Sequence, residues 1–584
     1  MKKIFLLFTL TFTLVAFSQK SDLKGKNLIN YKRLKYIKTN AKFGKVTLVK
    51  TYQKDNPQFS IETHTQPQFI YKSATAIPIN EQNASKGTVF LLTFSAKTTK
   101  SSLETGEAKV NLLFKQSTSY KNNIVSTQSL SSNWKTYYVP FQSDININKK
   151  DLAIVMHYGF KPQAFLIKDL SFQVFPEGTK LSSLPKTKIV YRGMEEDAKW
   201  RKDALKRIEA IRKGNIQVQF TKNGKPLANK SLQIKLKKHF FPFGAAISAK
   251  EITQKPEDYK NFKKAFNHVV LANDLKIKSW QWEKKRPTTL KALEILSNDG
   301  YKVKGHVLIW PGFNYLTQEI KDNKDNPTKV KEITNNHLNI ILDVTKGKIS
   351  HWDVVNEAYT NKDLQKITGS EEILYNGFRV LKQKQPNVKA FTNEYGIISK
   401  GGLDTKKQEW YYNFVKRIDV ATNGKIDGIG IQSHIGSDLT PPEKVLELLG
   451  YYATLGKQIS ISEFTMDIQD PMIREQYTKD FMIAALSHPS VSEFLFWGYV
   501  EDERKKVDIF NKDGSLGAMG KAYISLVHDA WKTNLVGKTN AEGFVNGRGF
   551  FGTYEYTFVE DGKVINGTFK LNPRQRGFIK INIE

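Results

Sequence analysis

The chain has 584 residues, too many for one ordinary domain, so we expect two to four domains. Hydrophobic residues make up 40% of it and aromatic residues 12%, which favours folded domains over disorder. The absence of cysteine excludes disulfides and thiol nucleophiles. The formal net charge of +33 would suit an acidic partner, but the excess is mostly Lys spread along the chain, with no nucleic-acid-binding signature.

The first 18 residues have the pattern of a secretory signal peptide. Lys2 and Lys3 precede the apolar run Ile4–Phe17, and Ala16 and Ser18 are the small residues expected before a cleavage site. We therefore expect export of a bacterial protein to the medium, the cell surface or the periplasm. No other stretch approaches the roughly 18 apolar residues of a membrane span, so no integral membrane segment is expected in the mature chain.

Residues 22–175 read as an all-β module. Short alternating runs recur between turn-type residues, which is typical of a β-sandwich or jelly roll. No pair of acidic residues stands out, so we expect a non-catalytic role. The expected strands are Lys45–Tyr52, Gln68–Lys72, Thr88–Ala96, Lys109–Gln116, Trp134–Phe141, Asp151–His157 and Phe165–Phe175.

A linker and a helix follow over residues 176–214. The segment Glu195–Arg212 is amphipathic, with Leu205, Ile208 and Ile211 on one face. Residues 215–238 then predict a β hairpin, in which Asn223-Gly224 forms a tight turn.

From residue 239 to 532, apolar strands alternate with helical segments. Eight such units over about 290 residues match a (β/α)₈ TIM barrel. The expected strands are Phe240–Ile247, His268–Ala272, Lys302–Ile309, Ile349–Val355, Val388–Asn393, Gly428–Ser433, Ile459–Ser462 and Glu493–Trp497. Residues 533–584 return to strand periodicity and predict a small β extension, either a cap packed on the barrel or a sorting element.

Two of the expected barrel strands end in a carboxylate. Glu357 follows the strand that begins at Ile349, and Glu463 follows Ile459–Ser462. Catalytic side chains of TIM barrels lie at the C-terminal ends of strands. Paired carboxylates there can hydrolyse an acetal, one protonating the leaving oxygen and the other acting at the anomeric carbon.

An ordered series of motifs surrounds these two residues. The motifs are Phe241-Pro-Phe-Gly-Ala-Ala-Ile247, Asn273-Asp-Leu-Lys276, Lys304-Gly-His-Val-Leu-Ile-Trp310, Trp352-Asp-Val-Val-Asn-Glu357, Thr392-Asn-Glu-Tyr395, Gly428-Ile-Gly-Ile-Gln-Ser-His434, Ile461-Ser-Glu463 and Phe496-Trp-Gly498. With them, residues 215–584 resemble glycoside hydrolase family 10, the endo-β-1,4-xylanases. The N-terminal module resembles, more weakly, a carbohydrate-binding module such as those of family 22.

The resemblance implies a role for each matching residue. Glu357 would be the acid/base, Glu463 the nucleophile, and Asn356 would hold the sugar 2-hydroxyl, while His434 would hydrogen-bond Glu463. No metal and no cofactor is implied. The implied substrate-binding residues are Asn273, Lys276, His306, Trp310, Gln432 and Trp497.

Three positions depart from the family pattern. Pro311 stands where many members have His. Thr465 stands where many have an acid, so either His434 lacks a carboxylate partner or Asp467 supplies one. The segment Glu501–Lys506 replaces a tryptophan that often covers the sugar, which predicts a more polar rim.

The implied function is a secreted retaining endo-β-1,4-xylanase acting on xylan. The basic charge adds weak support for acidic glucuronoxylan as a substrate. Two alternatives stay open. One is a β-glucanase of the same barrel clan, which shares the Asn-Glu and Glu strand ends. The other is a carbohydrate-binding surface protein with an inactive barrel.

Overall fold

The computed structural model describes residues 24–583 except 35, 38–41, 50–56, 104, 117–123, 469, 503–505 and 561. The expected signal peptide lies outside the described residues. The chain divides into two compact units, residues 1–101 with 108–188, and residues 102–107 with 189–584. In the part of the chain that the structure describes, no helix has the length and apolarity needed to cross a bilayer.

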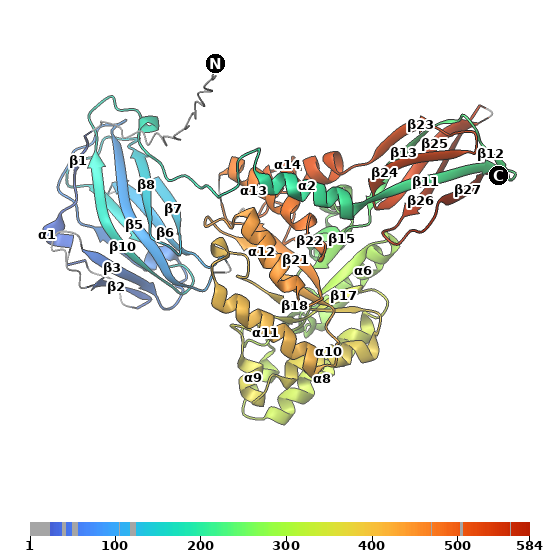
Figure 1. The fold of residues 1–584 in the computed structure, drawn as a ribbon. Coiled ribbons are helices and arrows are strands. Elements are labelled where there is room, and N and C mark those ends of the chain that lie inside the picture. Colours follow the sequence, from blue (N-terminus) through green and yellow to red (C-terminus); the bar gives the residue numbers. More distant parts are fainter. Residues whose placement is uncertain are drawn as a thin grey trace, which may run out of the picture. The chain divides into compact units, whose positions relative to one another are not determined.

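Unit 1 is a β-sandwich of two antiparallel sheets (Figure 1). One sheet has the order β2-β3-β10-β5-β8, with β1 paired to β10, and the other has the order β4-β9-β6-β7. The strands are β1 Lys26–Asn27, β2 Gly44–Val49, β3 Gln58–Thr63, β4 Ala74–Ile77, β5 Val89–Ser101, β6 Ala108–Gln116, β7 Ile124–Leu130, β8 Lys135–Gln142, β9 Leu152–His157 and β10 Gln163–Val174. A short helix, α1 Tyr31–Leu34, and two 3₁₀ turns, η1 Ile70–Lys72 and η2 Leu181–Ser183, complete the unit.

Alternation of apolar and polar residues builds this sandwich. In β10 every second side chain from Gln163 to Ile167 is buried, and Phe172 of β10 stacks on Phe90 of β5 at 5.3 Å between ring centroids. Phe114 of the other sheet packs against Phe90 at 4.9 Å, so the core lies between the sheets. The strand expected at Gln68–Lys72 is wrong, because this stretch ends in the 3₁₀ turn η1.

Unit 2 is built on the expected TIM barrel. Eight parallel strands close on themselves, since β14 pairs with both β15 and β22. The barrel strands are β14 Phe243–Ile247, β15 His268–Leu271, β16 Lys302–Ile309, β17 His351–Asn356, β18 Lys389–Glu394, β19 Gly428–Ile431, β21 Gln458–Met466 and β22 Val491–Phe496, and a two-residue strand, β20 His434–Ile435, pairs with β21. Each of the eight expected strands is confirmed within a few residues.

Helices and short turns connect the strands. The helix expected over Glu195–Arg212 is confirmed and begins at Lys199. The α-helices of unit 2 are α2 Lys199–Arg212, α3 Ala249–Gln254, α4 Pro256–Ala265, α5 Ile277–Trp280, α6 Arg286–Asn298, α7 Gln318–Asp322, α8 Pro327–Val344, α9 Asp363–Thr368, α10 Glu372–Lys384, α11 Thr405–Ala421, α12 Pro442–Ala453, α13 Pro471–Leu486 and α14 Ala518–Ile524. The 3₁₀ turns η3 Glu283–Lys285 and η4 Lys400–Gly402 and the π-helix η5 Ser525–Ala530 complete the connections.

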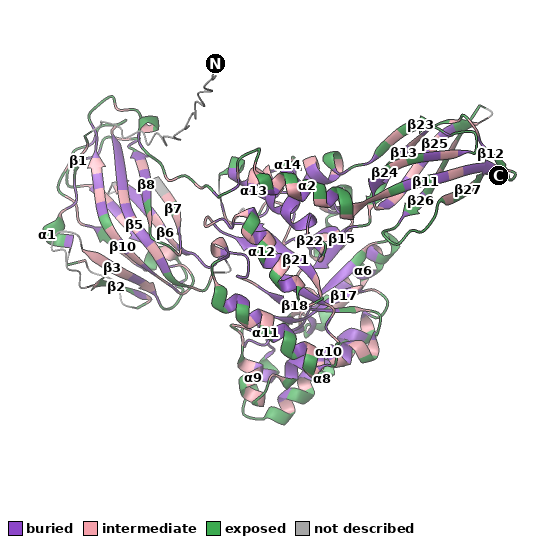
Figure 2. Cartoon of the chain, in the orientation of Figure 1, coloured by how far each residue is buried: buried purple, intermediate pink, exposed green. Residues whose placement is uncertain are grey.

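The barrel strands are buried on both faces, as parallel strands between helices must be (Figure 2). Trp352 of β17 is fully buried, and it fills the space beside Gly305 of β16. A Cβ on Gly305 would lie 2.3 Å from the Trp352 ring, so only glycine fits there. This close packing fixes the position of β17 against β16.

The last strands of the chain pair with the strands that precede the barrel. The orders are β12-β11-β24, with β27 paired to β11, and β23-β13-β25-β26. The bounds are β11 Lys213–Lys222, β12 Lys225–Pro226, β13 Ser231–His239, β23 Asn534–Lys538, β24 Phe544–Phe550, β25 Gly552–Glu560, β26 Lys563–Leu571 and β27 Ile579–Ile583. The expected hairpin of β11 with β13 is wrong: the Asn223-Gly224 turn leads only into β12, and β13 joins the other sheet.

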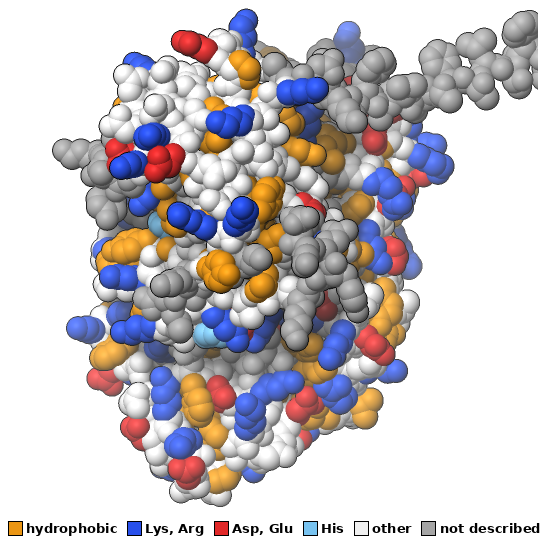
Figure 3. Space-filling view, turned by 90° about the vertical axis from the view of Figure 1, so that its left-hand side faces the viewer, with side chains coloured by type: hydrophobic (Ala, Val, Ile, Leu, Met, Phe, Trp, Pro, Cys, Tyr) orange, Lys and Arg blue, Asp and Glu red, His pale blue; other side chains and the backbone are white. Residues whose placement is uncertain are grey.

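Basic side chains are scattered rather than gathered on the face shown in Figure 3. Lys and Arg are spread across that face with Asp and Glu among them. This agrees with the even distribution of Lys along the sequence.

Candidate active site

Glu357 lies directly after β17 in a conformation that few residues adopt. Its φ angle is 55°, in the left-handed region, and its N–H donates to the carbonyl oxygen of Asn393 at 2.9 Å. The side chain is 8% exposed, and its Oε1 accepts a hydrogen bond from Gln432 at 3.1 Å. Such backbone strain is typical of functional positions, where the surrounding structure holds it in place.

Glu463 lies within β21 and is buried near the same strand ends. Asn393 donates from Nδ2 to Glu463 Oε1 at 2.7 Å. The backbone N–H of Glu463 donates to the carbonyl oxygen of Gln432 at 3.1 Å. Its Oε2 lies 3.4 Å from Nε2 of His434. The structure therefore brings Glu463 and His434 together, as expected.

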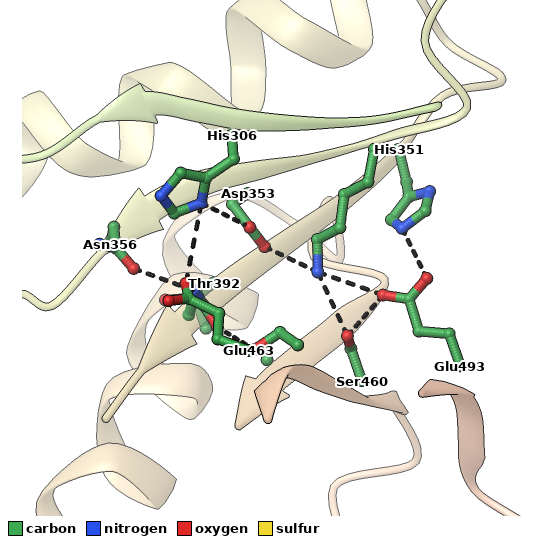
Figure 4. A network of polar contacts seen from close by, with 12 residues as sticks. His306, His351, Asp353, Asn356, Thr392, Ser460, Glu463 and Glu493 are labelled. Atoms are coloured by element: carbon green, nitrogen blue, oxygen red, sulfur yellow. Dashed lines mark hydrogen bonds and ion pairs between the residues drawn. The ribbon is translucent and has the colours of Figure 1, made fainter. Parts of the chain in front are cut away.

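A chain of amide side chains connects the two carboxylates. Gln432 donates to both Glu357 and Asn356, the latter at 3.1 Å, and Asn393 donates to both Asn356, at 3.0 Å, and Glu463. Figure 4 shows Asn356 and Glu463 close together in this network. Barrel closure thus joins residues that lie 106 positions apart in the sequence (463 − 357).

Asn393 was not among the expected site residues. It follows Thr392 in β18, and its Oδ1 accepts from the hydroxyl of Ser462 at 2.6 Å. The signal was present in the motif Thr392-Asn-Glu-Tyr395, but an amide at a strand end carries no charge that would single it out.

The ring of His434 contacts a hydroxyl at Nδ1 and the Glu463 carboxylate at Nε2. Its Nδ1 lies 2.8 Å from Oγ1 of Thr465, and both residues are buried. Thr465 stands where many family members have an acid. The partner of His434 at Nδ1 is therefore a neutral hydroxyl.

A buried charged network extends from the site toward the opposite end of the barrel (Figure 4). The register of β16 and β17 places His306 beside Asp353, and His306 Nδ1 lies 2.9 Å from Asp353 Oδ2 and 3.9 Å from Glu463 Oε1. Lys304 Nζ lies 3.1 Å from both Asp353 Oδ1 and Glu493 Oε1. Asp353, Lys304 and Glu493 were also not expected at the site.

Burial and neighbouring charges set the ionisation of this network. Burial opposes a charged Glu493, but His351 and Lys304 hold its pKa well below the usual range. Burial likewise opposes a charged Lys304, yet the two carboxylates raise its pKa above the usual value. Burial lowers the pKa of His306, with a smaller contribution from Lys276. The network therefore consists of a charged lysine between two carboxylates.

Lys276 sits between two aromatic rings of the site. Its Nζ donates to Asn273 Oδ1 at 2.7 Å and lies 4.7 Å from the ring centre of Trp310 and 5.7 Å from that of Trp497. Burial lowers the pKa of Lys276, while Glu463 and Glu357 oppose that effect. The expected sugar-binding residues on these strands therefore do lie together, beside both carboxylates.

Three buried polar atoms of the site have no hydrogen-bond partner among the described residues. They are Asn356 Nδ2, Gln432 Oε1 and Trp310 Nε1. An unpaired buried polar atom is costly, and a ligand's hydroxyl groups can supply the missing partner. The site thus has unused donors and an acceptor next to the two carboxylates.

The loop after Trp310 is ordered by stacking and backbone bonds. Trp310 stacks on Tyr315 at 3.5 Å between ring centroids, and the carbonyl of Pro311 accepts from the N–H groups of Asp363 and Leu364. Pro311 therefore belongs to a fixed wall of the site. Part of the segment Glu501–Lys506, expected at the rim, lies outside the described residues.

Among the residues the structure describes, one group brings three metal-type ligands together: His268, His351 and Glu493. His351 Nε2 lies 2.8 Å and His268 Nε2 3.7 Å from Glu493 Oε2, so both rings contact the carboxylate directly, with no room for an ion between His351 and Glu493. The other oxygen of Glu493 faces Lys304. This geometry does not fit a metal ion.

Comparison with known proteins places the barrel in a family. Residues 231–513 match the model of "Glycosyl hydrolase family 10". Endo-1,4-beta-xylanase 1 of Arabidopsis thaliana is 28% identical over 364 residues, 60% of this chain and 37% of that protein. Anti-sigma-I factor RsgI6 of Acetivibrio thermocellus is 28% identical over 387 residues, 64% of this chain and 48% of that protein.

A solved structure, xylanase 10B from Thermotoga petrophila RKU-1 in complex with xylobiose, is 21% identical with a TM-score of 0.45, covering 50% of this chain and 94% of that one. The chain spans less than half the length of the two curated relatives named above. Residues 231–513, which include Glu357 and Glu463, form a glycosyl hydrolase family 10 domain.

Proposed function

We propose that this protein is a retaining endo-β-1,4-xylanase. The observation that carries the proposal is the pair of buried carboxylates, Glu357 and Glu463, connected through the amides of Gln432, Asn356 and Asn393. Membership of family 10 and the xylanase names of several relatives support it.

In the first step, Glu463 attacks the anomeric carbon while Glu357 protonates the departing oxygen. The bond between the anomeric carbon and that oxygen breaks, and a glycosyl-enzyme ester forms. The hydrogen bond from Asn393 stabilises the Glu463 carboxylate and fixes its direction.

In the second step, Glu357, now ionised, takes a proton from water. The water oxygen attacks the anomeric carbon, and Glu463 leaves as a carboxylate, so configuration is retained. This mechanism predicts carboxyl groups about 5–5.5 Å apart. Water is the second substrate, and no cofactor takes part in the proposal.

The surrounding residues hold the sugar. Asn356 Nδ2 is available to the sugar 2-hydroxyl, a contact that can tighten in the transition state. Asn273, Lys276, His306 and Gln432 supply further polar groups, and Trp310 and Trp497 supply aromatic faces for sugar rings.

Release of reducing sugar from xylan, carboxymethylcellulose and mixed-linkage β-glucan tests the substrate. We expect the fastest release from xylan, and none from the Glu463→Ala variant. Faster release from a glucan would replace the xylanase proposal by the β-glucanase alternative. Unchanged activity of Glu463→Ala would contradict the assigned nucleophile.

Export through residues 1–18 and sugar binding by unit 1 are further parts of the proposal. N-terminal sequencing of the protein from the medium, periplasm and cell surface should give a chain starting at Gln19. Affinity electrophoresis of residues 22–180 in gels with soluble xylan should show retardation. Migration equal to that in a gel without xylan would assign unit 1 a spacer role.

A further inference from the structure

A cavity of about 1060 Å³ lies at the end of the barrel opposite the catalytic carboxylates. Its lining includes residues at or just before the first residues of β14, β16, β18, β21 and β22. The end of α2, the end of β24 and the loop 572–576 between β26 and β27 complete the wall. We call it the floor cavity. At this size it can hold a ligand of several rings.

The lining of the floor cavity carries one sign of charge. Among the described residues that line it there is no Asp and no Glu, although acidic residues are interspersed elsewhere on the surface. A concave site with one sign of charge concentrates ligands of the opposite sign. The basic residues that line it are Arg212, Lys302, Lys389, Lys457, Arg574 and Arg576.

Most of these cations lack a neutralising partner. Lys457 pairs with Asp419 at 2.6 Å, and Lys389 donates to the amide oxygen of Gln458. Within the described ranges, no ion pair is recorded for Arg212, Lys302 or Lys389, nor for the two arginines of the loop 572–576. An anion in the cavity would supply the missing charge.

Arg212 is a fixed part of the wall. Its guanidinium donates to the backbone carbonyls of Leu486, His488 and Val491 at 2.8–2.9 Å and lies 4.8 Å from the ring centre of Phe241. Burial lowers the pKa of Arg212 to about 10, so it remains charged at neutral pH. Its position is therefore set before any ligand arrives.

An aromatic ring lines the same cavity. Phe240 is 55% exposed, the most exposed Phe recorded among the described residues. A sugar ring can stack on an exposed aromatic face, whereas a free phosphate ion has no apolar face with which to stack. Cations beside an exposed ring thus favour a ligand that has both carboxylates and apolar ring faces.

We propose that the floor cavity is a second carbohydrate site, which binds oligosaccharides bearing uronic acid carboxylates. The choice of a sugar ligand rests on the proposed function; the choice of an anion rests on the lining alone. Bound there, a uronate-decorated chain would be held by the same domain that cleaves it, at a place separate from the cleavage site.

Isothermal titration calorimetry with trigalacturonic acid tests the proposal, because this probe has carboxylates but no β-1,4-xylosyl backbone. The full-length protein should bind it at least tenfold more tightly at 20 mM NaCl than it binds maltotriose, a neutral trisaccharide. The triple variant Lys302→Gln/Lys389→Gln/Arg574→Gln should weaken this binding at least tenfold. Phe240→Ala should weaken trigalacturonate binding without changing the affinity for inorganic phosphate.

The matched control removes the same charge elsewhere: Lys291→Gln/Lys331→Gln/Lys406→Gln, three exposed lysines. An equal loss in this control would assign the binding to overall charge and overturn the proposal. Equal affinity for phosphate and trigalacturonate would make the cavity a general anion site and refute a sugar ligand. The triple variant Lys302→Gln/Lys389→Gln/Arg574→Gln should hydrolyse undecorated xylo-oligosaccharides as fast as wild type. Failure of the xylanase proposal would be seen separately, as the absence of this hydrolysis in the wild-type protein.

Discussion

The Nδ1 atom of His434 lies 2.8 Å from the hydroxyl oxygen of Thr465, while Nε2 of the same ring lies 3.4 Å from Oε2 of Glu463. The hydroxyl therefore orients the imidazole that contacts the proposed nucleophile. Both residues are buried, so a lost hydrogen bond here is not replaced easily by water.

Thr465→Val removes this hydroxyl and keeps the side-chain shape. We expect kcat to fall about tenfold with KM nearly unchanged, since an unpaired buried Nδ1 costs about 1–3 kcal/mol. Steady-state kinetics on xylohexaose measures both constants. Thr465→Ser retains the hydroxyl and should stay within about twofold of wild type; equal loss in both variants would point to packing instead.

The roles of the two glutamates can be separated by the leaving group. Glu357→Ala should lower activity on xylan by about 10²–10⁴-fold, because protonation of the leaving oxygen is lost. With an aryl xylobioside whose leaving group needs no proton, formation of the glycosyl-enzyme should be nearly normal in Glu357→Ala and absent in Glu463→Ala. Pre-steady-state release of the aryl group measures this. The opposite pattern would exchange the two assignments.

Asn393→Ala tests the amide that contacts both Asn356 and Glu463. A hydrogen bond to a charged group contributes about 1.5–3 kcal/mol, so kcat should fall about ten- to hundredfold. Ser462→Ala, which removes only the hydroxyl that donates to Asn393, is the control and should cost less. A kcat of Asn393→Ala within twofold of wild type would show that the amide chain does not matter for the reaction.

Glu493 should make the fold acid-sensitive. Its folded pKa is depressed, so its contribution to stability is present above the unfolded pKa of about 4.3 and is lost as pH falls through the folded pKa. Glu493→Gln should therefore lower the free energy of unfolding by about 3–5 kcal/mol at pH 7, and the difference from wild type should shrink toward pH 3.

Urea unfolding at pH 7, 5, 4 and 3 measures this difference. Glu294→Gln changes an exposed glutamate on α6 and should show little difference at any of these pH values. A difference between wild type and Glu493→Gln that stays constant with pH would mean that Glu493 contributes by packing rather than by charge.

The barrel could be predicted from sequence because its signals are local. Apolar strands such as Lys302–Ile309 are followed by helices with clear periodicity, and each pairs with its neighbour in chain order. The strands of residues 213–239 were harder: β13 pairs with β25, more than 300 positions later, and no local pattern reveals that partner. The turn at Asn223-Gly224 therefore suggested the wrong hairpin.

The residues of the candidate site, like the strands of the fold, could be predicted from sequence only in part. Glu357 and Glu463 could be proposed from sequence because a carboxylate ending an apolar strand is conspicuous, and His434 and Asn356 lie beside them in recognisable motifs. Lys304 and Glu493 lie in positions that read as ordinary strand residues. Their importance depends on the barrel closing so that β16 and β22 both face the same interior, which spacing along the chain does not show.

Because β11 pairs with β24, this sheet cannot be completed until most of the chain has been synthesised. Residue 213 leaves the ribosome long before residue 550, its partner in the sheet. At a synthesis rate of about 5–20 residues per second, roughly 17–67 s pass between the synthesis of β11 and that of its partner β24. During that time an unpaired strand is exposed to other chains. Chaperone capture of nascent chains stopped before residue 534 should therefore be stronger than capture of the finished chain.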